Sequence, residues 1–187
     1  MSDILRVAIH ESGHCAGALA MGERVALVTI VPSAGMLGHV LPAALPPGVR
    51  VAGPAVELTA LERGRCVAGA AFVSACGEAA EQMIFGDALL GHGDRHDVAD
   101  DAADVLDLLK IEPGVWARAL HEAAERFVHD AHEQIEVLAV GLVRERTVTG
   151  ARALEIVGGR PPAPDLRAVH GAIEFFAARR ARARAAT

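Results

Sequence analysis

Two histidines stand four positions apart near the start of the chain, and a glutamate directly follows the first. His10, Glu11 and His14 lie in the sequence HESGH. On an α-helix, residues four apart share one face, so both imidazoles can approach one ion while the glutamate projects beside them. Imidazole and carboxylate suit zinc, and a catalytic zinc keeps three protein ligands and one water. The spacing predicts a catalytic zinc site with Glu11 as general base, although so short a motif also arises by chance.

A third ligand must come from further along the chain, and two segments could supply it. CGEAAEQMIFG contains Glu78 and Glu81, and GDRHDVADDA contains Asp94, His96, Asp97, Asp100 and Asp101. Acidic residues at the start of a helix also have a purely structural explanation, because the positive end of the helix dipole stabilises carboxylates. The residues alone therefore leave the choice of third ligand open.

The HESGH motif falls within a predicted helix, and two predicted strands follow it. Apolar residues recur at helical spacing over Asp3–Met21, and Gly22 is a plausible stop. Residues 24–32 and 35–42 are short, β-branched or apolar stretches bounded by proline and glycine, which predicts two strands joined by a turn. Residues 42–58 contain four prolines and show no periodicity, which predicts a loop.

The rest of the chain is predicted to be helical. Thr59 and Glu62 form a capping box for a helix that runs to Phe85 and ends at Gly86. Further helices are expected at 94–110, 115–145 and 151–157, and after RPPAP in a last helix capped by Asp165. The expected fold class is mainly α with a small β-sheet, and the expected division is a domain at 1–160 followed by a C-terminal helix with an arginine-rich end at 161–187.

Composition narrows the classes of partner. The chain has 187 residues and a net charge of −6, without the basic stripe that nucleic-acid binding requires. Its apolar runs fall short of the roughly 20 residues of a membrane-spanning helix, so direct membrane insertion is not expected. Three cysteines imply no disulfide framework, which favours the cytoplasm.

Four blocks of the sequence resemble, in order, the protease domain of the FtsH family of ATP-dependent zinc metalloproteases. The blocks are VAIHESGHCAGALA, VTIVPSAGMLGHV, GEAAEQMIFG and GDRHDVADDA, and AAERFVHDAHEQIEVLAVGLVRERTVTG resembles the closing helices of the family. The resemblance covers most of residues 5–157 and implies a zincin-like helical metalloprotease fold. It implies zinc as cofactor and a peptide or unfolded protein as substrate.

The resemblance also assigns roles to residues. It implies that His10, His14 and Asp97 hold zinc and that Glu11 activates water. Glu81, Asp94 and His96 are expected to support the ligands or to act as alternative ligands. The strand containing Val28, Thr29, Ile30 and Val31 is expected to pair with an extended substrate, and an ordinary core strand is the competing interpretation.

The chain departs from the family in what surrounds the protease region. It contains no G-x-x-x-x-G-K-[ST] nucleotide-binding motif and has a single lysine, Lys110. We therefore expect a stand-alone, ATP-independent zinc metalloendopeptidase, which could form a homo-oligomer or act with a separate unfoldase or adaptor. A catalytically inactive metal-binding interaction module, or a different zincin-type regulatory protease with a glutamate as third ligand, remain the alternatives.

Overall fold

The computed structural model describes residues 3–33, 35–43, 60–90 and 113–185. Over these residues the chain is mainly helical, with six helices and one small antiparallel sheet. The coarse fold class expected from the sequence is therefore confirmed. The predicted loop at 42–58, apart from its first two residues, and the predicted helix at 94–110 lie outside the described residues.

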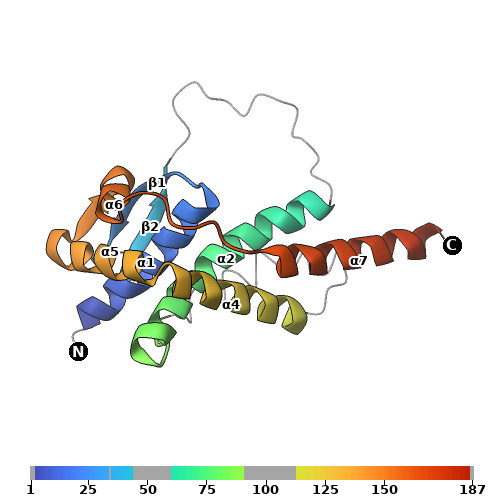
Figure 1. The fold of residues 1–187 in the computed structure, drawn as a ribbon, viewed down its shortest axis with the longest axis horizontal. Coiled ribbons are helices and arrows are strands. Elements are labelled where there is room, and N and C mark those ends of the chain that lie inside the picture. The colour runs from blue at the N-terminus through green and yellow to red at the C-terminus, as the bar shows by residue number, and fades with distance from the viewer. Residues whose placement is uncertain (1–2, 34, 44–59, 91–112, 186–187) are drawn as a thin grey trace, which may run out of the picture.

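Helix α1 (Asp3–Met21) occupies the centre of the fold, with the bounds that its periodicity predicts. Gly22 ends it in a left-handed conformation, with a φ of 84° that a side chain would disfavour. Most residues of α1 are buried, because α2, α5 and the sheet each contact it (Figure 1). A helix covered on several sides can place polar side chains in a dry environment.

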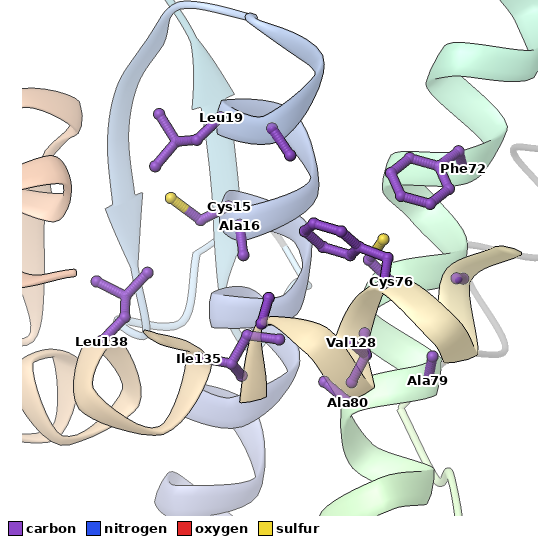
Figure 2. Packing of buried hydrophobic residues seen from close by; sticks show 14 of the residues in the cluster. Cys15, Ala16, Leu19, Phe72, Cys76, Ala79, Ala80, Val128, Ile135 and Leu138 are labelled. Carbon is purple, nitrogen blue, oxygen red and sulfur yellow. The ribbon is translucent and has the colours of Figure 1, made fainter. Parts of the chain in front are cut away.

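Helix α2 (Ala60–Phe85) packs closely against α1. The contact depends on small residues: a methyl group added to Gly13 would lie 2.9 Å from Cβ of Ala80, and one added to Gly17 would lie 3.0 Å from Sγ of Cys76. Figure 2 shows this layer of the core, where α1 and α2 meet helices α4 and α5. Because the two helix backbones approach so closely, α2 can present even its backbone to side chains of α1.

The sheet has three strands in the order β2-β1-β3. The predicted pair forms as β1 (Val25–Thr29) and β2 (His39–Pro42), while β3 (Thr147–Thr149) was not predicted. Val28 of β1 is the central residue, facing Val40 in one neighbour and Val148 in the other. Strand β1 is therefore paired along both edges.

The helix predicted at 115–145 is two helices, α4 (Pro113–Asp130) and α5 (His132–Glu145). At the junction, ring Nδ1 of His132 donates to the carbonyl oxygen of His129 at 2.9 Å and competes for an acceptor of the helical ladder. Ile135, Leu138 and Leu142 of α5 are buried in the core that includes α1.

Two more helices complete the described part of the chain. Helix α6 (Gly150–Ile156) begins where the Thr149 side chain accepts from the backbone N–H of Arg152, as an N-cap does. Helix α7 (Arg167–Ala185) extends to the end of the molecule farthest from the sheet (Figure 1), and its Val169 and Ile173 join the common core. None of the described helices combines the length and apolar character needed to cross a membrane.

Candidate metal centre

The rings of His10 and His14 meet on one face of α1. Their Nε2 atoms are 2.9 Å apart, and the ring planes are nearly perpendicular, at 86°. His10 is only 5% exposed and His14 is partly buried, so the two rings meet where they are largely shielded from solvent. One helical turn of separation thus brings two imidazole nitrogens to a shared point, as the HESGH spacing predicts.

The opposite nitrogen of each ring faces an acceptor on α2. Nδ1 of His10 lies 2.7 Å from Oε1 of Glu81, and Nδ1 of His14 lies 2.9 Å from the carbonyl oxygen of Val73. A carboxylate and a carbonyl only accept, so each Nδ1 carries a proton, and in the neutral imidazoles each Nε2 then carries the lone pair. Two lone pairs directed at one point suit a cation, and metal-binding histidines characteristically have such acceptors behind them.

Glu81 is completely buried and surrounded by donors. Its Oε2 accepts from the guanidinium of Arg6 at 3.1 Å and from the backbone N–H of Leu89 at 2.9 Å, and Leu90 N–H lies 3.3 Å from Oε1. Burial by itself would raise the pKa of Glu81, but the hydrogen bonds from His10, Leu89 and Arg6 outweigh it and hold the pKa below its usual range. The carboxyl group is therefore ionised at neutral pH and accepts the hydrogen bond from His10.

A glycine makes room for the second ring. A methyl group added to Gly77 of α2 would lie 2.5 Å from Cε1 and Nε2 of His14. The imidazole therefore rests directly on the α2 backbone, four residues after the carbonyl of Val73 that holds it. A glycine inside a long helix is the sequence signal for such a close approach.

Glu11 projects into the same cleft as the two histidines. The cleft has a volume of about 540 Å³, and its walls include His10, Glu11 and His14 from α1, Val73 from α2, and residues 35–40. The Glu11 side chain reaches the start of β2, where a methyl group on Gly38 would lie 2.7 Å from Oε1 of Glu11. A carboxylate in the same cleft as the two imidazole rings can exchange a proton with a water molecule held in that cleft.

The third ligand is not found in the described part of the chain. Asp94, His96 and Asp97 lie outside it, and the described residues contain no group of three histidine, cysteine, aspartate or glutamate side chains placed to hold a metal. Glu81 contacts the Nδ1 side of His10, away from the shared Nε2 point. This geometry gives Glu81 the supporting position and disfavours it as third ligand.

Two cysteines near the site are buried, and the pKa of each thiol is raised. Burial, with a contribution from the Glu11 carboxylate, raises the pKa of the Cys15 thiol to about 12. Burial alone raises the pKa of Cys76 well above its usual value. Both thiols are fully buried in the hydrophobic core, and neither is among the residues that line the cleft with the two histidines.

The expected substrate strand needs correction. Both edges of β1 are occupied, by β2 and β3, across Leu27–Thr29, and Val28 and Ile30 are buried in the core. Beyond β1, the N–H of Ile30 donates to the carbonyl of Arg146 and that of Val31 to Thr29 Oγ1. An extended peptide therefore cannot pair with β1 as predicted. Within the described residues, β2 is an edge strand of the sheet, and its His39, Val40 and Pro42 line the cleft.

No protein-family model and no curated protein matches this chain.

Proposed function

We propose that this chain is a zinc metallopeptidase that cleaves peptides or unfolded polypeptide without ATP. The observation that carries the proposal is the convergence of two imidazole Nε2 atoms 2.9 Å apart, each ring held from behind by an acceptor. The Glu11 carboxylate lies in the same cleft, as a hydrolytic site requires. The donor set fits zinc, which accepts neutral imidazole together with a carboxylate.

In this proposal, His10 and His14 hold zinc through Nε2, and Asp97 is the third ligand. Bound zinc supplies Lewis acidity, which polarises a peptide carbonyl and makes water acidic enough to ionise near neutral pH. Glu11 takes the proton from the attacking water and passes it to the leaving amine. Its surroundings favour this role, because Glu11 is only 6% exposed and bulk water competes little for its carboxylate.

The cleft also supports a peptide substrate. We propose that an extended segment pairs with β2, an edge strand with residues that line the cleft, in place of the pairing with β1 predicted from the sequence. Met36 and Leu37, about half exposed, and the half-buried Val40 give this region an apolar character. Such a surface suits the side chains that unfolded polypeptides expose.

The test is Glu11→Gln, because the amide keeps the shape of the side chain but cannot accept a proton. We expect zinc content to remain near one per chain while peptide hydrolysis falls by about 100-fold or more. The matched control is Glu122→Gln on the exposed face of α4, where the carboxylate makes only a loose pair with Arg126 at 3.9 Å. That variant should keep both zinc and activity.

Two results would refute the proposed activity. Hydrolysis by Glu11→Gln at the wild-type rate would remove Glu11 from the chemistry. Wild-type protein that holds zinc but cleaves no member of a peptide library would indicate a metal-binding module without catalysis. Each result is read by metal analysis together with mass spectrometry of the digest, with and without chelator.

A further inference from the structure

Arg6 lies one helical turn before His10 on α1 and reaches the C-terminal end of α2. One of its terminal nitrogens is 3.1 Å from Oε2 of Glu81 and 2.7 Å from Oδ1 of Asp87. Its guanidinium carbon lies 4.4 Å from the centre of the Phe85 ring. The side chain is 20% exposed and so is partly shielded from solvent. These contacts tie Arg6 to the helix end that carries Glu81.

The two carboxylate oxygens of Glu81 accept hydrogen bonds from different side chains. Oε1 accepts from His10 at 2.7 Å, while Oε2 accepts from Arg6 and from Leu89 N–H. A buried carboxylate needs a compensating cation, and loss of one member of such a pair leaves an uncompensated charge. Because Arg6 holds Oε2, it also fixes the rotation of the carboxylate and directs Oε1 at His10.

We propose that Arg6 is a positioning residue of the metal site, acting on His10 through Glu81. By fixing the Glu81 carboxylate, Arg6 keeps the proton of His10 on Nδ1 and the lone pair of Nε2 directed at the point shared with His14. Asp87 holds Arg6 in turn from the solvent side. The inference rests on the proposed zinc site at His10 and His14, but it is independent of whether the protein hydrolyses peptides.

The test compares zinc affinity in Arg6→Met, Arg6→Lys and the wild type, measured by competition with a chromophoric chelator. We expect Arg6→Met to weaken zinc binding by about 10-fold or more, within the range seen when groups behind metal ligands are removed. Arg6→Lys should fall between the two, because an ammonium keeps the charge but lacks the planar geometry of guanidinium. Unchanged zinc affinity in either folded variant would overturn the inference.

Arg152 provides the matched control. It bridges Glu145 and Glu155 at 2.9 and 3.2 Å, so Arg152→Met also removes an arginine with two carboxylate partners. None of these three residues lines the cleft. We expect this variant to bind zinc as the wild type does, and an equal loss in both methionine variants would show a general effect of removing a salt bridge.

A second measurement separates this inference from the proposed function. Nitrogen-15 NMR of the His10 ring in zinc-free protein should show the Nδ1–H tautomer in the wild type and a mixture of tautomers in Arg6→Met. If the wild type binds no zinc, the proposed function fails, while this tautomer shift still reports the action of Arg6 on His10. If the wild type binds zinc and the tautomer and affinity of the variant are unchanged, only the role of Arg6 is removed.

Discussion

At the scale of single residues, the two histidine rings are held by different kinds of acceptor. His10 depends on the Glu81 side chain, whereas His14 depends on a backbone carbonyl of α2. A substitution can remove the first acceptor but not the second, which exists wherever α2 is helical. The orientation of His10 is therefore set by a side chain, and that of His14 by the packing of two helices.

The first residue-scale prediction compares Asp97→Ala with Glu81→Ala. If Asp97 is the third ligand, its loss should leave the purified protein nearly free of zinc, because three protein ligands are needed to hold the ion. Glu81→Ala should lower zinc affinity by about 10- to 100-fold, since it removes only the support behind His10. Metal content and chelator competition measure both variants.

The opposite ranking would change the ligand set. If Asp97→Ala binds zinc normally and Glu81→Ala is metal-free, then Glu81 must turn from His10 Nδ1 toward the metal, and the assignment of Asp97 is wrong.

The sequence predicts the side chains of the site better than their supports. The H-E-x-x-H pattern predicts His10, Glu11 and His14 as site residues, because helical periodicity places the two histidines on one face with the glutamate beside them. The sequence gives no signal for the role of the Val73 carbonyl, because every residue has the same backbone carbonyl group. No pattern in the sequence predicts a role for Arg6, because a single arginine on a helix ordinarily points into solvent. The positions of Asp94, His96 and Asp97 are outside the described residues.

At the scale of elements, the packing of α1 against α2 requires a glycine at position 77, and this glycine lowers the helix propensity of α2. Glycine in a helix interior is about 1 kcal/mol less favourable than alanine. The His14 ring nevertheless occupies the space of a Gly77 side chain. The helix thus gives up intrinsic stability where the ring must lie against it.

The element-scale prediction is that Gly77→Ala weakens zinc binding although alanine is the better helix former. Its methyl group would lie 2.5 Å from two ring atoms of His14, which must therefore move. Gly171→Ala on α7 is the matched control, because among the described residues no atom outside its own stretch of helix lies within 4 Å of the added methyl group. The control should gain roughly 0.5 to 1 kcal/mol in free energy of unfolding. Zinc titration and urea unfolding of both variants provide the comparison, and unchanged zinc affinity in Gly77→Ala would contradict the packing argument.

Element bounds were predictable where local signals agreed. Asp3–Met21 combines apolar periodicity with a glycine stop, and α1 has these bounds. No change in the polarity of the residues marks where the preceding helix ends and β3 begins. Only the pairing with β1 makes these three residues a strand. The division between α4 and α5 falls at Ala131, a strong helix former, so neither glycine nor proline marks it.

At the scale of the whole molecule, one continuous core includes residues from every described helix and from the sheet. Cys15 and Cys76 lie inside this core with no exposed surface, whereas Cys66 on α2 is exposed. The three thiols therefore report on the integrity of the fold.

The prediction for the whole molecule is that Ellman's reagent modifies one of the three thiols in native protein and all three after denaturation. The expected reactive thiol is Cys66, because burial raises the pKa of both Cys15 and Cys76 and removes them from the reagent. Peptide mapping of the labelled protein identifies the site. Rapid native labelling of Cys15 or Cys76 would be inconsistent with the core described above.

The supports of the two histidines also set an order of events during synthesis. Val73 lies 59 residues after His14, and Glu81 lies 71 residues after His10. At ribosomal rates of about 5–20 residues per second, the nascent chain carries the complete HESGH motif for roughly 3 to 13 s before Glu81 is made. During that interval the imidazoles lack at least the Glu81 acceptor, so a metal ion bound that early would meet an unformed site. Loading of the proposed zinc site therefore requires that the second helix has already been synthesised.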